Sequence, residues 1–192
     1  MKYLIIYAHP NPASFNHAIL ETVESELKKH GHETRVRDLN ALNYNPVLSA
    51  NDFAGLKSGN LPDDIKTEQQ HVSWADVLVV IHPVWWTGMP AILKGYFDRT
   101  LLYGFAYKFD KNGLVKMLTG KKVFIFSTHG QPKEVYEKEM FHAMNLTSNT
   151  GVFEFTGMEV KHHEYFSSVI SVDDSVRKSY IQKVVDILHK DM

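Results

Sequence analysis

Short apolar runs alternate with amphipathic segments along the whole chain, and this alternation limits the fold more than any other feature. The first run, YLIIYA from Tyr3 to Ala8, is continuous and rich in Ile and Tyr, as in a strand buried on both faces. From His17 to His30 the apolar residues fall on one helical face, and Gly31 supplies a stop signal. A buried strand followed by an amphipathic helix predicts the start of a βαβ unit.

The same alternation recurs to the end of the chain. Further strands are predicted over His32 to Leu39, Asp76 to Ile81, Lys121 to Ser127 and Val160 to Val169. Further helices are predicted from about Pro62 to Trp74, from about Pro90 to Leu102, within Val135 to Phe155, and from Asp173 to Lys190. The segment from Asn40 to Gly59, in which Asn, Pro and Gly are scattered, is expected to be a long connection.

Five strands alternating with helices predict an α/β fold of parallel strands, joined by right-handed crossovers, with helices on both faces. We expect a doubly wound, flavodoxin-like five-stranded sheet of order 2-1-3-4-5. A length of 192 residues with 44% hydrophobic content is enough for one well-buried core, so residues 1–192 are predicted to form a single domain. A ligand should then lie beyond the carboxyl ends of the strands, at the loops that begin at His9, His82 and Thr128.

Composition excludes several classes of function. The formal net charge is -1 with 22% charged residues, so no basic surface indicates nucleic acid, and small molecules are the expected ligands. The chain has no cysteine, which excludes disulfides, thiolate metal sites and cysteine nucleophiles. No segment approaches the roughly 20 apolar residues of a membrane-spanning helix, and no signal peptide is recognised. We therefore expect a cytoplasmic protein with no transmembrane segment, for which a membrane partner would be peripheral.

The first candidate loop, HPNPASFN from His9 to Asn16, contains no glycine. It is therefore neither a Walker A loop nor a dinucleotide fingerprint. Ser14 and Asn16 can cap the following helix or hydrogen-bond an anion, beside main-chain amides that favour negative charge at a helix N-terminus. A phosphate site and an ordinary capped helix both fit this loop.

The second loop, PVWWTGMP, carries two adjacent tryptophans. Trp85 and Trp86 can offer an indole face and main-chain amides to a flat heterocycle at the rim of the sheet. The alternative is that they pack beneath a helix, although two adjacent tryptophans rarely both point inward. Gly88 permits close approach of the main chain to a ligand, or serves only the turn.

The third loop begins STHG, and Tyr136 and His142 lie beyond it. A hydroxyl and an imidazole can donate protons to a substrate oxygen or balance a developing negative charge, although spacing alone does not establish this. The adjacent His162 and His163 should point to opposite faces of a strand and so cannot jointly bind a metal. We assign no metal site.

Together these motifs resemble the NAD(P)H:quinone oxidoreductase family of flavin enzymes, the flavodoxin-like group that includes DT-diaphorase. AHPNPASFNHA resembles the family's flavin-phosphate loop, and LNYNPVLSANDF resembles its segment after the second strand. HPVWWTGMPAILKGYFDRTLLYGFAY resembles its long signature around the isoalloxazine ring. With STHG and the spacing of Tyr136 and His142, the resemblance covers most of Met1 to Asn145, and the last third resembles the family mainly in pattern.

The resemblance implies a set of cofactor residues. Those expected around the flavin's ribityl phosphate are His9, Ser14, Phe15, Asn16 and Ala18. Those expected to line the ring are Pro83, Val84, Trp85, Trp86 and Thr87. Those expected to form the opposite wall are Ser127, Thr128, His129 and Gly130.

Catalytic and substrate residues are also implied by the resemblance. Tyr136 and His142 match the family's pair that stabilises charge as hydride arrives. Trp86, Tyr107 and His129 would contact the substrate, with Tyr107 supplied by the partner subunit of a homodimer. Where human members have an aromatic residue, a second tyrosine and a glycine, this chain has Thr87, Phe109 and His129, so the shape of the pocket stays open.

The implied activity is a ping-pong, two-electron reduction of quinones by NAD(P)H, with nitro or azo compounds as further candidate acceptors. FMN is the expected cofactor, because the connection between Phe53 and Leu61 is shorter than in the larger members, which use that region near the adenine end of FAD. FAD remains the alternative. Some relatives instead regulate a potassium-efflux system, so an ancillary redox-sensing subunit is the alternative function.

Overall fold

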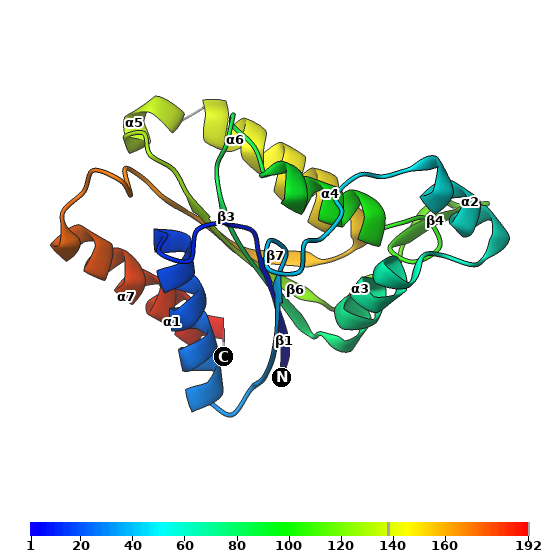
Figure 1. Cartoon of the computed structure of the whole chain (residues 1–192), viewed down its shortest axis with the longest axis horizontal. Helices are drawn as coiled ribbons and strands as arrows, with labels where there is room; N and C mark the ends of the chain where they lie inside the picture. The colour runs from blue at the N-terminus through cyan, green and yellow to red at the C-terminus, as the bar shows by residue number, and fades with distance from the viewer. Residues whose placement is uncertain (138, 192) are drawn as a thin grey trace.

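The structure is a computed structural model that describes residues 1–137 and 139–191, and a parallel sheet forms its centre (Figure 1). Within these residues the sheet has five strands in the order β2-β1-β3-β6-β7. They are β1 (Lys2–Tyr7), β2 (Glu33–Asp38), β3 (Val77–Pro83), β6 (Lys122–Thr128) and β7 (Glu159–Phe166). All neighbouring pairs are parallel. The flavodoxin-like order 2-1-3-4-5 predicted from the sequence is confirmed.

Helices cover both faces of the sheet (Figure 1). One face carries α1 (Phe15–Lys29) and α7 (Asp174–Asp191). The other carries α3 (Asp63–Trp74), α4 (Ala91–Thr100), α5 (Lys133–Tyr136), α6 (Glu139–Asn145) and the π-helix η1 (Leu146–Glu154). Because successive strand residues point to opposite faces, Ile5 packs with the α1 side and Ile6 with the α4 side. None of the described helices has the length and apolar character needed to cross a membrane.

The segment from Asn40 to Gly59 is more than a connection, so that prediction was wrong. It contains α2 (Ala50–Ser58), which begins with a capping box. The Ser49 hydroxyl accepts from the Asp52 amide, and the Asp52 carboxylate accepts from the Ser49 amide. The buried guanidinium of Arg99 then donates to the same carboxylate, which fixes α2 against α4.

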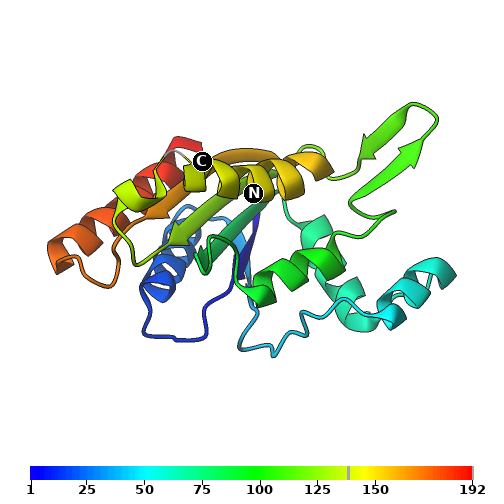
Figure 2. The same ribbon diagram turned by 90° about the horizontal axis from the view of Figure 1, so that it is seen from above.

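A hairpin that sequence analysis did not assign follows α4. Strand β4 (Tyr107–Asp110) pairs antiparallel with β5 (Gly113–Lys116). Figure 2 shows this hairpin projecting away from the central sheet. Its residues therefore lie far from the carboxyl edge of the sheet, where the candidate site is found.

Candidate functional site

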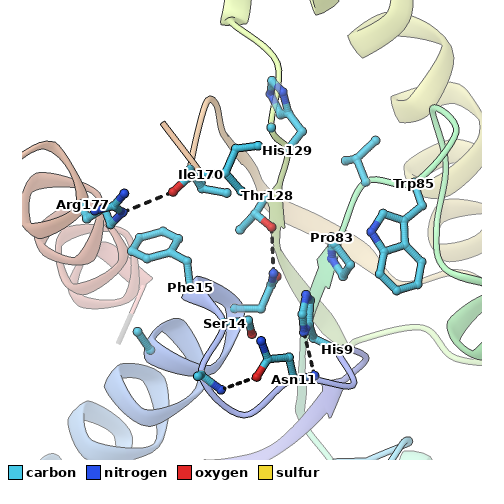
Figure 3. A pocket seen from close by; sticks show the side chains of 16 residues that line it. His9, Asn11, Ser14, Phe15, Pro83, Trp85, Thr128, His129, Ile170 and Arg177 are labelled. Carbon is cyan, nitrogen blue, oxygen red and sulfur yellow. Dashed lines mark hydrogen bonds between the residues drawn. The ribbon is translucent and has the colours of Figure 1, made fainter. Parts of the chain in front are cut away.

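A cavity of about 630 Å³ lies at the carboxyl ends of β1, β3 and β6 (Figure 3). The three predicted loops meet there, as expected at the point where the strand order reverses. The predicted cofactor residues that line it are His9, Ser14, Phe15, Asn16, Ala18, Pro83, Val84, Trp85, Thr128, His129 and Gly130. It is also lined by Asn11, Ala13, Val169, Ile170 and Arg177, which were not predicted.

The first loop turns into α1 at Ser14, whose hydroxyl accepts from the His17 amide at 3.2 Å. This cap places the remaining amides of the helix N-terminus beside the cavity, where they favour an anion. His9 adds a donor, because its Nδ1 accepts from the Asn11 amide at 3.1 Å and its neutral ring therefore carries the proton on Nε2. Burial lowers the pKa of His9, so the neutral ring is favoured.

Asn16 joins the first loop to the third. Its Nδ2 donates to Thr128 Oγ1 at 2.8 Å, and the side chain is buried. Its Oδ1 is also buried and has no hydrogen-bond partner among the described residues. Buried polar atoms are nearly always paired, so an orphaned oxygen beside a cavity is a feature expected where a ligand completes the site.

Arg177 contributes a cation that sequence analysis missed. It lies in the first turns of α7, donates from Nε to the Val169 carbonyl at 3.2 Å, and reaches the cavity on the same side as Phe15 (Figure 3). Its Nη1 also pairs with Asp174 at 2.6 Å. The sequence did contain a signal for Arg177. In an alternating fold the helix that follows a strand begins at the carboxyl edge of the sheet, so residues in the first turns of α7 are expected near the cavity.

The tryptophan loop is a tight two-residue hairpin. Trp85 and Gly88 exchange main-chain hydrogen bonds of 3.0 and 3.1 Å. Trp86 and Thr87 between them have φ angles of 51° and 58°, the left-handed region required by a type I′ turn and rarely occupied by such side chains. Trp86 is 100% exposed and Trp85 is 46% exposed, so neither indole packs beneath a helix. Only Trp85 of the pair lines the cavity.

The two predicted catalytic residues are placed differently. The ring of Tyr136 packs against that of His129, with centroids 4.4 Å apart and planes tilted by 43°, and so supports the third wall of the cavity. His129 is held by Ser167 Oγ at 3.0 Å from its Nε2, and burial lowers its pKa. His142 lies on an exposed side of α6 and is not among the residues that line the cavity. Neither Tyr136 nor His142 lines the cavity, although Tyr136 contacts the wall residue His129, and the catalytic roles of both stay predictions.

Ser127, Trp86, Thr87 and Tyr107 also lie outside the cavity lining. Ser127 is fully buried under the edge of the sheet, between two histidine rings. Tyr107 lies in the hairpin, where its ring packs on Phe155 with centroids 5.1 Å apart. Within one chain Tyr107 therefore cannot cover the cavity.

The ring neighbours of Ser127 form a hydrogen-bond chain that the sequence did not reveal. His82 Nδ1 donates to the Pro83 carbonyl at 2.9 Å, which leaves its Nε2 to accept from the Ser127 hydroxyl at 3.0 Å. Ser127 Oγ also lies within hydrogen-bond distance of His163 Nε2, at 2.9 Å. Burial lowers the pKa of His82 to about 4 and the pKa of His163 well below its usual value. Two neutral rings thus hold the main chain where the tryptophan loop begins.

His162 faces the opposite side of β7, as expected. Its Nε2 lies 3.1 Å from Glu164 Oε2, and Glu164 pairs with Lys183 of α7. The two adjacent histidines of this strand therefore belong to different layers of the fold.

The model of a family described as having a flavodoxin-like fold matches residues 1–188. The chain belongs to this family. An uncharacterized NAD(P)H oxidoreductase of Haemophilus influenzae is 36% identical, over 95% of this chain and 91% of that protein. NAD(P)H dehydrogenase (quinone) 1 of Rattus norvegicus is 33% identical, over 88% of this chain and 69% of that protein. The solved NAD(P)H:quinone oxidoreductase of Methanothermobacter marburgensis is 28% identical, with a TM-score of 0.84 over 96% of this chain and 93% of that one. The resemblance read from the motifs is confirmed.

Proposed function

We propose that this chain is a flavin-dependent oxidoreductase that reduces quinones with NAD(P)H. The observation that carries the proposal is the cavity between the loop of His9 to Asn16 and Trp85, in a chain similar over 95% of its length to an NAD(P)H oxidoreductase. One end of the cavity offers helix amides and a guanidinium, and the other offers an indole. Such a site suits a ligand that is anionic at one end and flat at the other.

The residues at the anionic end fit a flavin phosphate. The N-terminus of α1, the His9 Nε2 proton and Arg177 supply donors and positive charge, and the unpaired Oδ1 of Asn16 can accept from a hydroxyl. We propose FMN as the flavin, with FAD as the alternative that the experiment below distinguishes. Bound there, the flavin supplies the two-electron carrier between NAD(P)H and the quinone.

The chain's own contribution at the flat end is a fixed set of donors. The amides of Trp86 and Thr87 make no hydrogen bond within the described residues, so they are free to donate at the rim of the cavity. Donors held in place before the reaction stabilise negative charge as it develops. Tyr136 is the better placed of the two proposed charge-stabilising residues, because its ring packs on His129 whereas His142 lies on an exposed side of α6.

We also propose that the active form is a homodimer. An apolar groove of about 500 Å³ runs between α2, α4, the hairpin and η1, and it is lined in part by Phe53, Leu101 and Tyr107. Phe53 in this groove is exposed, and so is Phe109, whose ring packs edge-on to that of Tyr107. A second copy of the chain would cover this groove and bring its own Tyr107 toward the cavity of the first.

The test uses the purified full-length chain. We expect a yellow protein whose extracted cofactor has the mass of FMN and whose flavin absorbance is bleached by NAD(P)H and restored by a quinone. Extraction of FAD in place of FMN would change the proposed cofactor but leave the proposed activity unchanged. A colourless protein that rebinds neither flavin would contradict the proposal. Neither the relatives nor the described structure favours the regulatory-subunit alternative, so it is not proposed.

A further inference from the structure

A second cluster of ligand-type side chains lies at the end of the sheet opposite the cavity. Helices α1 and α7 pack side by side and end there (Figure 1). Glu26 and His30, one turn apart on α1, face His189 in the last turns of α7. Each offers one ligand atom, and these atoms all lie within 4.8 Å of one another. We propose that these three residues bind a divalent transition-metal cation of the zinc class, which fastens the end of α1 to the end of α7.

The separation of Glu26 and His189 already suits a common cation. Glu26 Oε2 lies 3.2 Å from His189 Nε2. Two ligands at bond lengths of about 2.0–2.1 Å in a tetrahedral zinc site are roughly 3.4 Å apart. A cation can thus replace the hydrogen-bonded proton between these atoms without moving either helix. The ring of His30 stands edge-on to that of His189, with centroids 4.9 Å apart. A small rotation of the His30 side chain would therefore bring its ring nitrogen to the cation as the third ligand.

His30 is held in the tautomer that a metal ligand needs. Its Nδ1 lies 2.9 Å from the main-chain carbonyl oxygen of Glu26. Because that oxygen can only accept, Nδ1 carries the proton, and the lone pair of the neutral ring is on Nε2. A carbonyl oxygen on the far nitrogen is the usual support of a histidine that binds zinc.

The local charges also favour a cation. His30 caps the C-terminus of α1 and His189 lies in the last turn of α7, where the helix dipoles place partial negative charge. Lys29 pairs with Glu26 through Oε1 at 2.7 Å, which leaves Oε2 to the cation. Three protein ligands leave the fourth position to water.

The sequence could not show this cluster. Glu26 and His30 have the spacing of a ligand pair on one helix, but His189 is distant in sequence and meets them only through the packing of α7 on α1. The adjacent His162 and His163, which attract attention in the sequence, lie on opposite faces of β7.

The experiment titrates Zn²⁺ into the full chain after dialysis against a chelator, by calorimetry, and repeats the titration with Co²⁺ in the visible spectrum. We expect one Zn²⁺ per chain with a dissociation constant in the micromolar range, and Co²⁺ bands of the intensity that four-coordination produces. Zinc in about hundredfold excess over that constant should raise Tm by roughly 5 to 10 °C.

Substitutions of the three proposed ligands test whether Glu26, His30 and His189 bind the metal. Glu26→Gln, His30→Ala and His189→Ala should each weaken Zn²⁺ binding by at least about tenfold and remove the rise in Tm. His162→Ala is the matched control, because His162 lies at a similar distance, 3.1 Å, from a carboxylate oxygen of Glu164, and no third ligand-type side chain joins this pair in the described part of the chain. Circular dichroism without metal shows whether each variant is folded, and His189→Gln replaces His189→Ala if the latter is not.

The proposal is overturned if the wild-type chain binds Zn²⁺ no more tightly than the millimolar range. It is also overturned if His162→Ala weakens binding as much as His189→Ala does, or if folded His30→Ala binds as tightly as wild type. Loss of binding confined to the three ligand variants supports it.

Discussion

The two ends of the central sheet use histidine in opposite ways. At the carboxyl end, His82 and His163 are buried, joined through Ser127, and held neutral because burial lowers their pKa values. At the amino end, His30 and His189 are exposed beside a carboxylate at two helix C-termini. The buried histidines His82 and His163 stay neutral and hold hydrogen bonds beneath the cavity. The exposed histidines His30 and His189 lie beside negative charge and are available to bind a cation.

The largest expected difference between the two ends is the response to acid. The pKa of His82 is about 4 in the folded chain and near 6.5 when unfolded. Above pH 6.5 the ring is neutral in both states. As the pH falls from 6.5 to 4 only the unfolded chain takes up the proton, so the free energy of unfolding falls by about 3 kcal/mol on account of this residue. Urea unfolding at several pH values within this window measures the loss.

His82→Gln isolates that contribution, because glutamine keeps a hydrogen-bonding group near Ser127 but does not titrate. The variant should lose less stability than wild type between pH 6.5 and pH 4. Equal losses in the two proteins would show that His82 does not have the depressed pKa.

The next largest effect is a difference in stability between variants of the adjacent residues His163 and His162. His163→Leu removes a buried ring that pairs with Ser127 Oγ and lies 2.8 Å from Asn149 Oδ1, so both partners lose a hydrogen bond. We expect the free energy of unfolding to fall by about 2 kcal/mol. His162→Leu, on the other face of β7, should change it by less than about 0.5 kcal/mol. Denaturant unfolding at pH 7 compares the two, and similar losses would contradict the assignment of His163 to the buried chain.

The sheet was predictable because its signals are local. Strands β1, β3 and β6 are short apolar runs, and the alternation of strand and helix patterns along the chain predicts parallel pairing with helices on both faces. The helix α2 was not predicted because Asn, Pro and Gly are scattered through the segment from Asn40 to Gly59. Its capping box at Ser49 and Asp52 was readable, whereas the Arg99 contact that holds it depends on packing.

The candidate site was predictable only where it is built from contiguous loops. The motifs at His9 to Asn16 and at Pro83 to Trp85 are continuous in sequence, and most of their residues line the cavity. Arg177 and Ile170 reach it from the last helix and the loop before it, whose position depends on how α7 packs on α1. Ser127 was predicted as a wall residue, but strand alternation turns its side chain away from the cavity toward His82 and His163.

A smaller effect is expected on flavin affinity at the cavity. Asn16→Ala removes the buried amide whose Oδ1 has no hydrogen-bond partner among residues 1–137 and 139–191. We expect flavin affinity to fall by about tenfold, the value of one hydrogen bond. Asn112→Ala, at the exposed tip of the hairpin, is the matched asparagine control. Fluorescence titration of the apoprotein with FMN measures both. Zinc binding should be unchanged in either variant, since the cluster at Glu26 lies at the opposite end of the sheet, and an unaltered flavin affinity would remove Asn16 from the site.

The smallest expected effect is a change in stability at Trp86, which tests whether the strained turn lowers the stability of the chain while serving its function. Trp86 holds a φ of 51° with its side chain fully exposed, so burial of the indole against the described residues does not offset the backbone strain. Trp86→Gly should relieve that strain and raise the free energy of unfolding by up to about 1 kcal/mol, while the KM for the quinone rises because the indole is lost. Trp86→Ala loses the same indole but keeps the strained backbone, so its KM should rise equally without the gain in stability. If the glycine variant were no more stable than the alanine variant, the left-handed turn would carry no strain, and if neither changed KM, the exposed indole would have no part in binding the acceptor.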